Sequence, residues 1–195
     1  MIGLINKFLS KDENSSLFYP IFQRLKKNTE VEKIFKSISE FSEKSEVRYV
    51  GGCVRKIINQ EEVDDIDLAT NIEPKKVIEI LKKDNIEFHE IGVEHGTITA
   101  RINRQKFEIT SLREDISTDG RHAKVKFSDN WHQDASRRDF TFNSIYADLN
   151  GNLFDPFNGK KDLEIGEVKF IGEADKRIKE DYLRILRYVR FFLNY

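Results

Sequence analysis

The 195-residue sequence lacks several features that define common protein classes. It has one cysteine, Cys53, so no internal disulfide framework can form, and a reducing compartment such as the cytoplasm is expected. It has no apolar run of membrane-spanning length and no secretory signal pattern, so we expect no membrane association. Its 33 Lys and Arg residues balance 34 Asp and Glu residues, for a formal net charge of −1. Any contact with nucleic acid must therefore come from local patches.

The first half of the chain shows clear periodic patterns. Apolar residues recur at helical spacing over 30–41, which predicts an amphipathic helix that packs on the segment that follows. Strands are expected at 47–50 and 66–70, and a helix is expected to begin near Pro74, because proline is tolerated in a first turn. Two extended runs within 97–112 indicate a hairpin.

The second half is more mixed in pattern. The charged segment 113–134 is expected to be a long surface loop. A second hairpin turns at Asn150-Gly151, a pair that favours positive φ at both positions. A strand is expected at 167–172, followed by one strong helix over 174–195. Strands between helices indicate an α+β domain.

These elements divide the chain into three parts. Residues 1–45 are expected to form an N-terminal helical segment that packs on the domain that follows. Residues 46–173 form the α+β domain itself, and 174–195 begin a further helical segment. The chain is long enough to bury a sizeable core of its own.

The stretch VDDIDLAT brings carboxylates together. Side chains two apart on a strand point to the same face, so Asp65 and Asp67 project together while Ile66 and Leu68 face the core. Two carboxylates this close repel unless a proton or cation holds them, and Mg²⁺ prefers oxygen ligands. The same alternation in KFEITSL lets a paired strand bring Glu108 to this site. Three such carboxylates can hold two metal ions that activate a hydroxyl and stabilise a leaving phosphate.

The stretch GGCVRK precedes these carboxylates. Gly51 and Gly52 have no Cβ, so the backbone can approach an anion closely, and Arg55 presents a guanidinium fork to phosphate oxygens. A metal-bound triphosphate is the ligand that the whole segment favours. A glycine turn followed by a solvated acidic loop remains the plain alternative for either element alone.

The last predicted helix has two distinct faces. Apolar side chains from Ile178 to Leu193 share one face, and a polar stripe that is available for a ligand lies beside it. An Asp and Arg three residues apart could equally form a surface salt bridge worth about 0.3–0.5 kcal/mol. The stripe consists of Asp181, Arg184, Arg187 and Tyr188.

GGCVRK followed by DDIDLAT resembles the signature of class II nucleotidyltransferases of the tRNA CCA-adding and bacterial poly(A) polymerase type. Further segments continue this pattern in the family's order, up to about residue 192. Several ordered motifs are far more specific than one pair of aspartates. The segments are FEITSLR (107–113), TDGRHAKV (118–125), RRDFTFNSIYAD (137–148), LFDPFNGKKDL (153–163) and EDYLRILRYVRF (180–191).

The resemblance implies a fold and an activity. The fold is a nucleotidyltransferase head with a mixed, mostly antiparallel sheet flanked by helices, followed by a truncated helical neck. The activity is metal-dependent transfer of CMP or AMP from CTP or ATP to a tRNA 3′ end, with Mg²⁺ as cofactor and pyrophosphate as product. Poly(A) polymerase of the same class is the alternative for the reaction.

Length leaves a second alternative open. Family members continue into neck, body and tail regions that hold the RNA, so this chain could be an inactive nucleotide- or RNA-binding module, or half of a split enzyme. The aromatic residues at the end of the last helix would leave an exposed apolar patch. We therefore expect a homodimer or a separately encoded C-terminal partner.

The resemblance also assigns site residues. Asp139 would read the ribose, and Asp181 with Arg184 would read the base edge of the incoming nucleotide. Asp139 could instead cap a helix, and Arg137 and Arg138 could be solvated surface charges. The catalytic residues implied are Asp65, Asp67 and Glu108, of which Asp65 and Asp67 bind metal; the nucleotide-binding residues are Gly51, Gly52, Arg55, Arg138, Asp139, Asn143, Asp181, Arg184 and Arg187.

Two positions depart from the family pattern. Lys56 stands where the family usually has aspartate, and either adds a cation near the phosphates or removes an ordering contact. Tyr182 stands where the family has proline. Because proline is tolerated only near a helix start, tyrosine is expected to let the last helix begin earlier.

Overall fold

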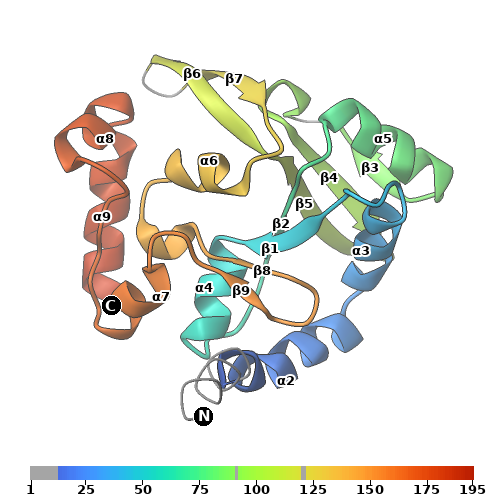
Figure 1. Ribbon diagram of the computed structural model, residues 1–195, viewed down its shortest axis with the longest axis horizontal. Coiled ribbons are helices and arrows are strands. Elements are labelled where there is room, and N and C mark those ends of the chain that lie inside the picture. The colour runs from blue at the N-terminus through green and yellow to red at the C-terminus, as the bar shows by residue number, and fades with distance from the viewer. Residues whose placement is uncertain (1–12, 91, 120–121) are drawn as a thin grey trace, which may run out of the picture.

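The computed structural model describes residues 13–90, 92–119 and 122–195. A seven-stranded sheet with the order β3-β4-β5-β2-β1-β8-β9 lies at its centre, and a separate two-stranded hairpin, β6-β7, extends from it (Figure 1). The strands are β1 (Val47–Val50), β2 (Ile66–Thr70), β3 (Glu87–His89), β4 (Thr97–Ile102), β5 (Gln105–Ser111), β6 (Arg113–Asp119), β7 (His122–Phe127), β8 (Tyr146–Ala147) and β9 (Leu153–Phe154).

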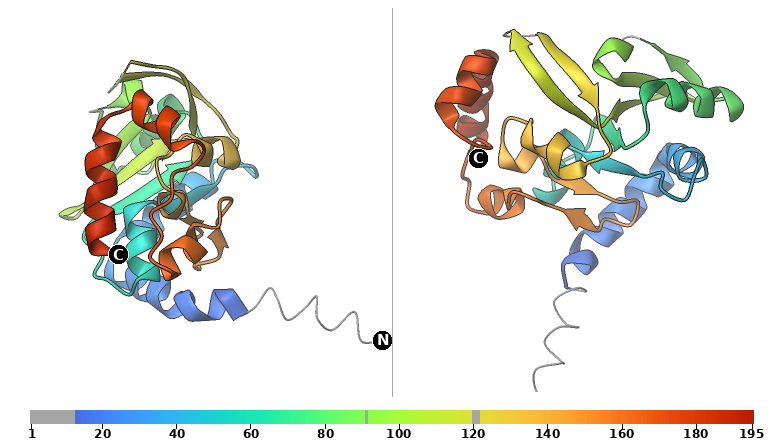
Figure 2. Two further views of the ribbon diagram at one scale, coloured as in Figure 1. Left: turned by 90° about the vertical axis from the view of Figure 1, so that its left-hand side faces the viewer. Right: turned by 45° about the horizontal axis from the view of Figure 1, so that its top comes forward.

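Helices surround the sheet, and α8 and α9 stand at the opposite end of the molecule from α5 and β3 (Figures 1 and 2). Among the described residues, no helix is both long and apolar enough to cross a membrane. The helices are α2 (Glu13–Asn28), α3 (Val31–Ser39), α4 (Gly52–Ile58), α5 (Pro74–Lys83), η1 (Val93–His95), α6 (Trp131–Ser136), η2 (Thr141–Asn143), α7 (Gly159–Glu164), α8 (Ala174–Glu180) and α9 (Leu183–Asn194).

The sheet is mixed, with one parallel junction. β2 pairs with β5 in parallel, whereas each of the other neighbouring pairs of this sheet is antiparallel. The hairpin of β4 and β5 turns at Asn103, whose φ of 54° suits asparagine. The expected α+β fold with a mostly antiparallel sheet is confirmed.

The helices α2 and α3 pack on this sheet. Ile34 and Ile38 of α3 are fully buried, and the ring of Tyr49 on β1 contacts Phe35 with centroids 4.9 Å apart. Fully burying an aliphatic side chain of this size contributes about 1.5–3 kcal/mol. Phe41, expected on the same face, is 44% exposed because α3 ends at Ser39. The first 12 residues of the expected N-terminal segment lie outside the described residues.

Two of the secondary-structure elements expected within residues 113–172 are wrong. The segment expected to be a loop over 113–134 forms the β6-β7 hairpin and then α6, because its backbone pairs along the hairpin despite the charged side chains. The strand expected at 167–172 is reduced to one bridge between Phe140 and Phe170, whose rings also pack 4.7 Å apart. Two backbone hydrogen bonds, from Thr141 to Lys169 and from Ile171 to Asp139, both at 3.0 Å, hold this segment together with the ring contact.

The turn after β8 also differs from expectation in detail. Gly151 has a positive φ of 86°, whereas Asn150 is not among the positive-φ residues. Asp148 explains this, since its Oδ1 accepts the backbone N–H groups of Asn150 and Asn152 at 2.8 and 2.9 Å. Such a turn needs only one left-handed residue.

The expected single helix over 174–195 is broken between α8 and α9. Asp181 at the break is extended, with φ −155° and ψ 105°. Its carboxylate accepts the N–H of Leu183 at 3.0 Å, and its carbonyl accepts the N–H of Arg184 at 3.1 Å. This local capping competes with a continuous helix. Tyr182 therefore does not extend the helix, in contrast to the expectation from the absent proline.

Candidate active site

A cleft of about 460 Å³ lies where the end of β1, η2, β6 and the helices α8 and α9 meet. Seven arginines and five carboxylates line it. Ten of the twelve residues that the sequence singles out belong to this lining, while Asp65 and Glu108 do not. The lining is Gly51, Gly52, Arg55, Asp67, Arg113, Asp115, Arg137, Arg138, Asp139, Asn143, Glu180, Asp181, Arg184, Arg187, Arg190 and Phe191.

The glycine bend opens the cleft. Gly51 has a φ of 67°, which L side chains rarely adopt, and a Cβ placed there would lie 3.8 Å from Nη1 of Arg138. A Cβ at Gly52 would lie 3.9 Å from a carboxylate oxygen of Asp67 and 4.0 Å from Nη2 of Arg55. The space that a side chain would take at this bend is therefore bordered by two cations and a carboxylate.

Asp67 is the carboxylate that the fold brings to this bend. It lies on β2 and pairs in parallel register with Glu108 on β5, whereas Asp65 precedes β2 and is exposed. Burial raises the pKa of Asp67, and the nearby charges of Glu108 and Asp65 raise it further, against opposing contributions from Arg138 and Arg55. Ionised Asp67 is thus under electrostatic stress that a cation would relieve.

The three predicted carboxylates do not converge on one point. Within the described residues no group of three or more His, Cys, Asp or Glu is arranged to hold a metal ion. The oxygen-donor chemistry of Asp67 and the exposed Glu108, adjacent in register, nevertheless fits a divalent cation such as Mg²⁺. The metal site at Asp65 and Asp67 stays a prediction.

A buried network fixes the arginines on the other wall. Asp134 of α6 is 1% exposed, and it accepts hydrogen bonds from the Tyr146 hydroxyl at 2.6 Å, from Arg138 Nη2 at 3.1 Å and from Arg137 Nε at 2.9 Å. Burial alone would raise the pKa of Asp134, but Arg138, Arg137 and the Tyr146 hydroxyl hold it well below its usual range. Arg137 and Arg138 are therefore not solvated surface charges.

Asp139 and Asn143 form the floor between the two walls. Asp139 is buried, and its Oδ1 accepts hydrogen bonds from the N–H of Phe140 at 2.8 Å and from Nδ2 of Asn143 at 3.0 Å. Its Oδ2 forms an ion pair with Nη2 of Arg187 at 2.8 Å. Asn143 in turn accepts a hydrogen bond from Arg55. Asp139 therefore links α9 to η2 instead of capping a regular helix.

The helices α8 and α9 are clamped to the head by charged groups. Arg177 donates hydrogen bonds to the carbonyls of Arg137 and Arg138, and Glu180 forms ion pairs with Arg177 at 2.5 Å and with Arg184 at 2.8 Å. Arg184 thus pairs with Glu180, so its surface salt bridge with Asp181 is not the arrangement found. Asp181, Arg184 and Arg187 of the polar stripe line the cleft, whereas Tyr188 lines the groove on the other side of the helix.

Charge crowding makes the cleft receptive to anions. Burial lowers the pKa of Arg113 to about 10, and the neighbouring Arg137 contributes to this shift. Arg113 Nε and Asp115 Oδ1 form an ion pair at 3.9 Å, but both are buried without a hydrogen-bond partner among the described residues. Unsatisfied buried polar groups are rare in folded proteins, and here they lie beside an arginine-rich lining. A polyanionic ligand would accept hydrogen bonds from the arginine donors of this lining.

Six lining residues were not predicted from the sequence. Arg113 and Asp115 lie two apart on β6, a spacing that would have placed them on one face had the segment been recognised as a strand. The first arginine of RRDF and the glutamate of EDYLR stand directly beside residues that were predicted. The six residues are Arg113, Asp115, Arg137, Glu180, Arg190 and Phe191.

Lys56, which departs from the family pattern, takes no part in the cleft. It pairs with Asp64 at 2.5 Å and does not line the cleft. Burial, together with the nearby Asp67, raises the pKa of the Cys53 thiol to about 12, so this thiol stays protonated and is no nucleophile. Asp155, within DPFNGKKDL, accepts the N–H groups of Gly159 and Lys160 at 2.8 and 2.9 Å, so it holds the start of α7 in place.

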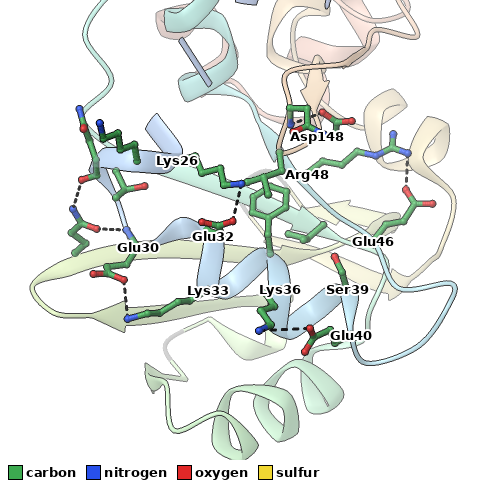
Figure 3. A pocket seen from close by; sticks show the side chains of 18 of the residues that line it. Lys26, Glu30, Glu32, Lys33, Lys36, Ser39, Glu40, Glu46, Arg48 and Asp148 are labelled. Atoms are coloured by element: carbon green, nitrogen blue, oxygen red, sulfur yellow. Dashed lines mark hydrogen bonds and ion pairs between the residues drawn. The ribbon is translucent and has the colours of Figure 1, made fainter. Parts of the chain in front are cut away.

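A larger cavity of about 1580 Å³ lies between α2, α3 and the turns after β4 and β8. Four of its six basic residues pair with acids on the same walls: Lys26 binds Glu32 at 2.7 Å, Arg48 binds Glu46 at 2.6 Å, and two further ion pairs lie on α3 or directly next to it (Figure 3). None of the predicted site residues lines it. This compensated cavity is therefore a poor candidate for chemistry.

Comparison with known proteins identifies the family. Residues 47–169 match the profile of the Poly A polymerase head domain. The chain is 48% identical over 160 residues to the Homo sapiens CCA tRNA nucleotidyltransferase 1, mitochondrial, across 80% of this chain and 37% of the relative. The chain thus spans little more than a third of that relative's length.

Solved structures agree with the sequence comparison. The crystal structure of the Bacillus stearothermophilus CCA-adding enzyme in complex with CTP matches with a TM-score of 0.74 and 31% identity, over 83% of this chain and 38% of that one. A tRNA nucleotidyltransferase complexed with a primer tRNA and an incoming ATP analog matches with a TM-score of 0.63 and 26% identity, over 81% of this chain and 44% of that one. Together with the profile match, these similarities mean that the chain belongs to the Poly A polymerase head-domain family, which includes the CCA-adding enzymes.

Proposed function

We propose that the arginine-rich cleft binds CTP and ATP and transfers their nucleoside monophosphate to the 3′ hydroxyl of tRNA, with release of pyrophosphate. The observation that supports this most is the convergence of Arg55, Arg138 and Asp67 on the glycine bend. Relatives support the substrates, since one is named a CCA tRNA nucleotidyltransferase and solved structures of others contain CTP, an ATP analog or tRNA.

The carboxylates would hold the cofactor. Asp65 and Asp67 would bind Mg²⁺, with Glu108, the register partner of Asp67, as a further oxygen donor. When bound, Mg²⁺ supplies charge neutralisation at the α-phosphate and a lowered pKa for the attacking hydroxyl. Metal dependence is thus part of the proposal.

The remaining residues bind and orient. Arg55 and Arg138 donate to phosphate oxygens at the bend, where the missing side chains of the two glycines leave room. Asp139, held by Asn143, accepts from the ribose, and Asp181 with Arg184 faces the base from the α8–α9 break. Arg187 completes the pocket through its ion pair with Asp139. Preorganised donors of this kind stabilise charge without reorganisation at the moment of reaction.

An exposed apolar face on α9 supports a protein partner. A groove of about 490 Å³ between this helix and the segment 167–174 adjoins the face. Contiguous apolar surface of this kind marks interaction sites. We propose that a second copy, or a separately encoded helical chain, covers it. The exposed residues are Tyr182, Leu183, Ile185, Leu186, Val189, Phe192 and Leu193.

Sedimentation velocity tests this partner. If the wild-type protein self-associates and the Leu186→Glu variant is monomeric, the homodimer is supported. If the wild-type protein is a monomer, the homodimer is ruled out. Complementation of activity by a second helical chain would then support the split arrangement.

An incorporation assay tests the function. The protein, with Mg²⁺ and tRNA lacking its 3′ end, is given CTP or ATP, and the added nucleotides are sequenced. Addition of C, C and A supports CCA addition, while runs of A on any RNA favour the poly(A) polymerase alternative. Calorimetric binding of CTP and ATP without transfer, alone or with a partner chain, would instead support a binding module.

The compartment is a further part of the proposal. We assign the protein to the cytoplasm, because its one cysteine is a reduced, buried thiol. The human relative carries a mitochondrial name, so fractionation of the source cells is the direct test.

A further inference from the structure

Arg55 is held on three sides, and α9 with the residue that follows it supplies two of them. Its Nε donates to the hydroxyl of Tyr195 at 2.9 Å, and its Nη1 donates to Asn143. Its guanidinium also stacks over the ring of Phe191, 4.7 Å from the centroid. The remaining nitrogen, Nη2, is the atom that lies 4.0 Å from the Cβ position of Gly52. The arm of the fork for which the described part of the chain provides no hydrogen-bond partner therefore faces the glycine bend.

Tyr195 is itself fixed. Its ring stacks on Phe191 with centroids 6.0 Å apart and planes 10° from parallel, and it meets Phe142 edge to face at 5.9 Å. Such aromatic pairs have preferred geometries, so the hydroxyl is held at a defined place. Arg55 therefore has a rigid acceptor for Nε instead of a mobile solvent molecule.

We propose that Tyr195 is a positioning residue that aims Arg55 at the phosphates of the bound nucleotide. This inference rests on the proposed function, because it deepens the role of Arg55 in the same cleft. Arginine is a long side chain with much rotamer freedom, and holding it in one rotamer before binding reduces the entropy lost on binding. Phosphate affinity at β1 and α4 thereby depends on the C-terminal end of α9.

A single-atom substitution tests this role. Tyr195→Phe keeps both ring contacts and removes only the hydroxyl. Tyr182→Phe is the matched control, because Tyr182 belongs to the same helical unit but is 67% exposed and lies outside the cleft. Binding of tripolyphosphate with Mg²⁺, measured by calorimetry, isolates the phosphate site from recognition of the base.

The expected result is selective. Tyr195→Phe should weaken tripolyphosphate binding and raise KM for CTP and for ATP by about 5- to 10-fold, the size of effect expected when one hydrogen bond that orients a binding group is lost. The turnover number, the CTP to ATP ratio and the melting temperature should stay close to those of Tyr182→Phe. In an Arg55→Lys background, which has no Nε donor, Tyr195→Phe should add less than about 2-fold, because the coupled partner is already absent.

Three results would overturn the inference. One is tripolyphosphate affinity in Tyr195→Phe equal to that of wild type. Another is an equal loss of affinity for all ligands together with a lowered melting temperature, which would mean a structural role. The third is a full effect of Tyr195→Phe in the Arg55→Lys background. Wild-type protein that binds neither tripolyphosphate nor CTP overturns the proposed function and this inference together, whereas the first three results leave the proposed function standing.

Discussion

The two main cavities differ in the burial of their charges as well as in size. The larger, of about 1580 Å³, holds lysines and glutamates that pair with one another across α2, α3 and β1. The smaller, of about 460 Å³, brings seven arginines and five carboxylates together, among them the buried Asp139 and Arg184. Volume alone would have selected the larger cavity. Buried charge instead favours the smaller one, which also holds ten of the twelve residues expected from the sequence.

The contrast has a physical basis. A surface ion pair such as that of Lys26 with Glu32 contributes about 0–1 kcal/mol to stability, and the lysine in it already has an acidic partner. In the cleft, burial and like-charged neighbours shift the pKa of Asp67 upward and that of Arg113 downward. Such pKa shifts concentrate at functional sites, because charged groups arranged to bind a ligand are destabilised while the ligand is absent.

The largest expected effect concerns Asp67. Asp67→Asn should reduce nucleotide transfer by about 10²–10³-fold, because the carboxylate nearest the glycine bend is lost. Glu32→Gln, the matched substitution in the larger cavity, should leave transfer unchanged. Rates of incorporation from CTP measure both. A comparable loss in Glu32→Gln would mean that the wrong cavity has been assigned.

The next effect is on stability. Asp134→Ala should lower the free energy of unfolding by about 3–5 kcal/mol, because it removes the buried carboxylate that pairs with the partly buried Arg137 and Arg138. Glu32→Ala should cost no more than about 1 kcal/mol. Urea denaturation measures both values. Equal losses in the two variants would contradict the contrast between the cavities.

The pH dependence of the Asp134 contribution follows from its depressed pKa. Because the folded pKa lies below the unfolded value, this contribution is fully present above about pH 4, the ordinary carboxyl range. It is lost only as the pH falls toward the depressed folded value. The difference in stability between wild type and Asp134→Ala should therefore be constant from neutral pH to about pH 5.

An intermediate effect is expected at the rim of the cleft. Arg187 is about half exposed and pairs with Asp139, so Arg187→Gln should raise KM for CTP by about 10-fold through one weakened charged contact. Lys33→Gln, which breaks the Glu30 pair in the larger cavity, should not change KM. Steady-state kinetics at two salt concentrations would also show whether the change in KM is electrostatic. If Lys33→Gln raised KM as much as Arg187→Gln does, the effect of Arg187 could not be assigned to its contact in the cleft.

A smaller effect has the opposite sign. Without divalent ions, Asp67→Asn should raise the free energy of unfolding at neutral pH by about 0.5–2 kcal/mol, the usual range when a functional strain is removed. The folded pKa of Asp67 lies above its unfolded value, so its stabilising contribution is present at low pH and lost as the pH rises through the folded pKa. The gain in unfolding free energy of Asp67→Asn should therefore become smaller at acidic pH. A gain that stays constant across pH would mean that it does not arise from the ionisation of Asp67.

The smallest effect tests the compensated cavity alone. Lys26→Ala should change the free energy of unfolding by less than about 1 kcal/mol and leave tripolyphosphate binding unchanged. Calorimetry and urea denaturation measure the two quantities. Strong loss of phosphate binding would move the ligand site to the larger cavity.

Much of this arrangement could be predicted from the alternation of apolar and polar residues and from the order of the motifs along the chain. The alternation around Asp67 and Glu108 sufficed to expect neighbouring strands, and the parallel register confirms that pairing. The strand β6 was missed because its inward residues, Arg113 and Asp115, are charged, so no apolar alternation signals it. The break at Asp181 was missed because a side-chain cap competes with the helix only in the folded geometry.

Asp134 was missed for a related reason. A lone aspartate in a polar segment gives no sign of burial, and only the fold surrounds it with two arginines and a tyrosine hydroxyl. Sequence patterns report which residues face one another along an element. Sequence patterns do not show which charged side chains become buried when elements far apart in the sequence pack together.

The position of α9 has a consequence for how the cleft is held together. Arg187 of α9 pairs with Asp139 at 2.8 Å, and Tyr195, directly after α9, accepts a hydrogen bond from Arg55 at 2.9 Å. A displacement of this helix would therefore disturb two separate contacts of the cleft at the same time.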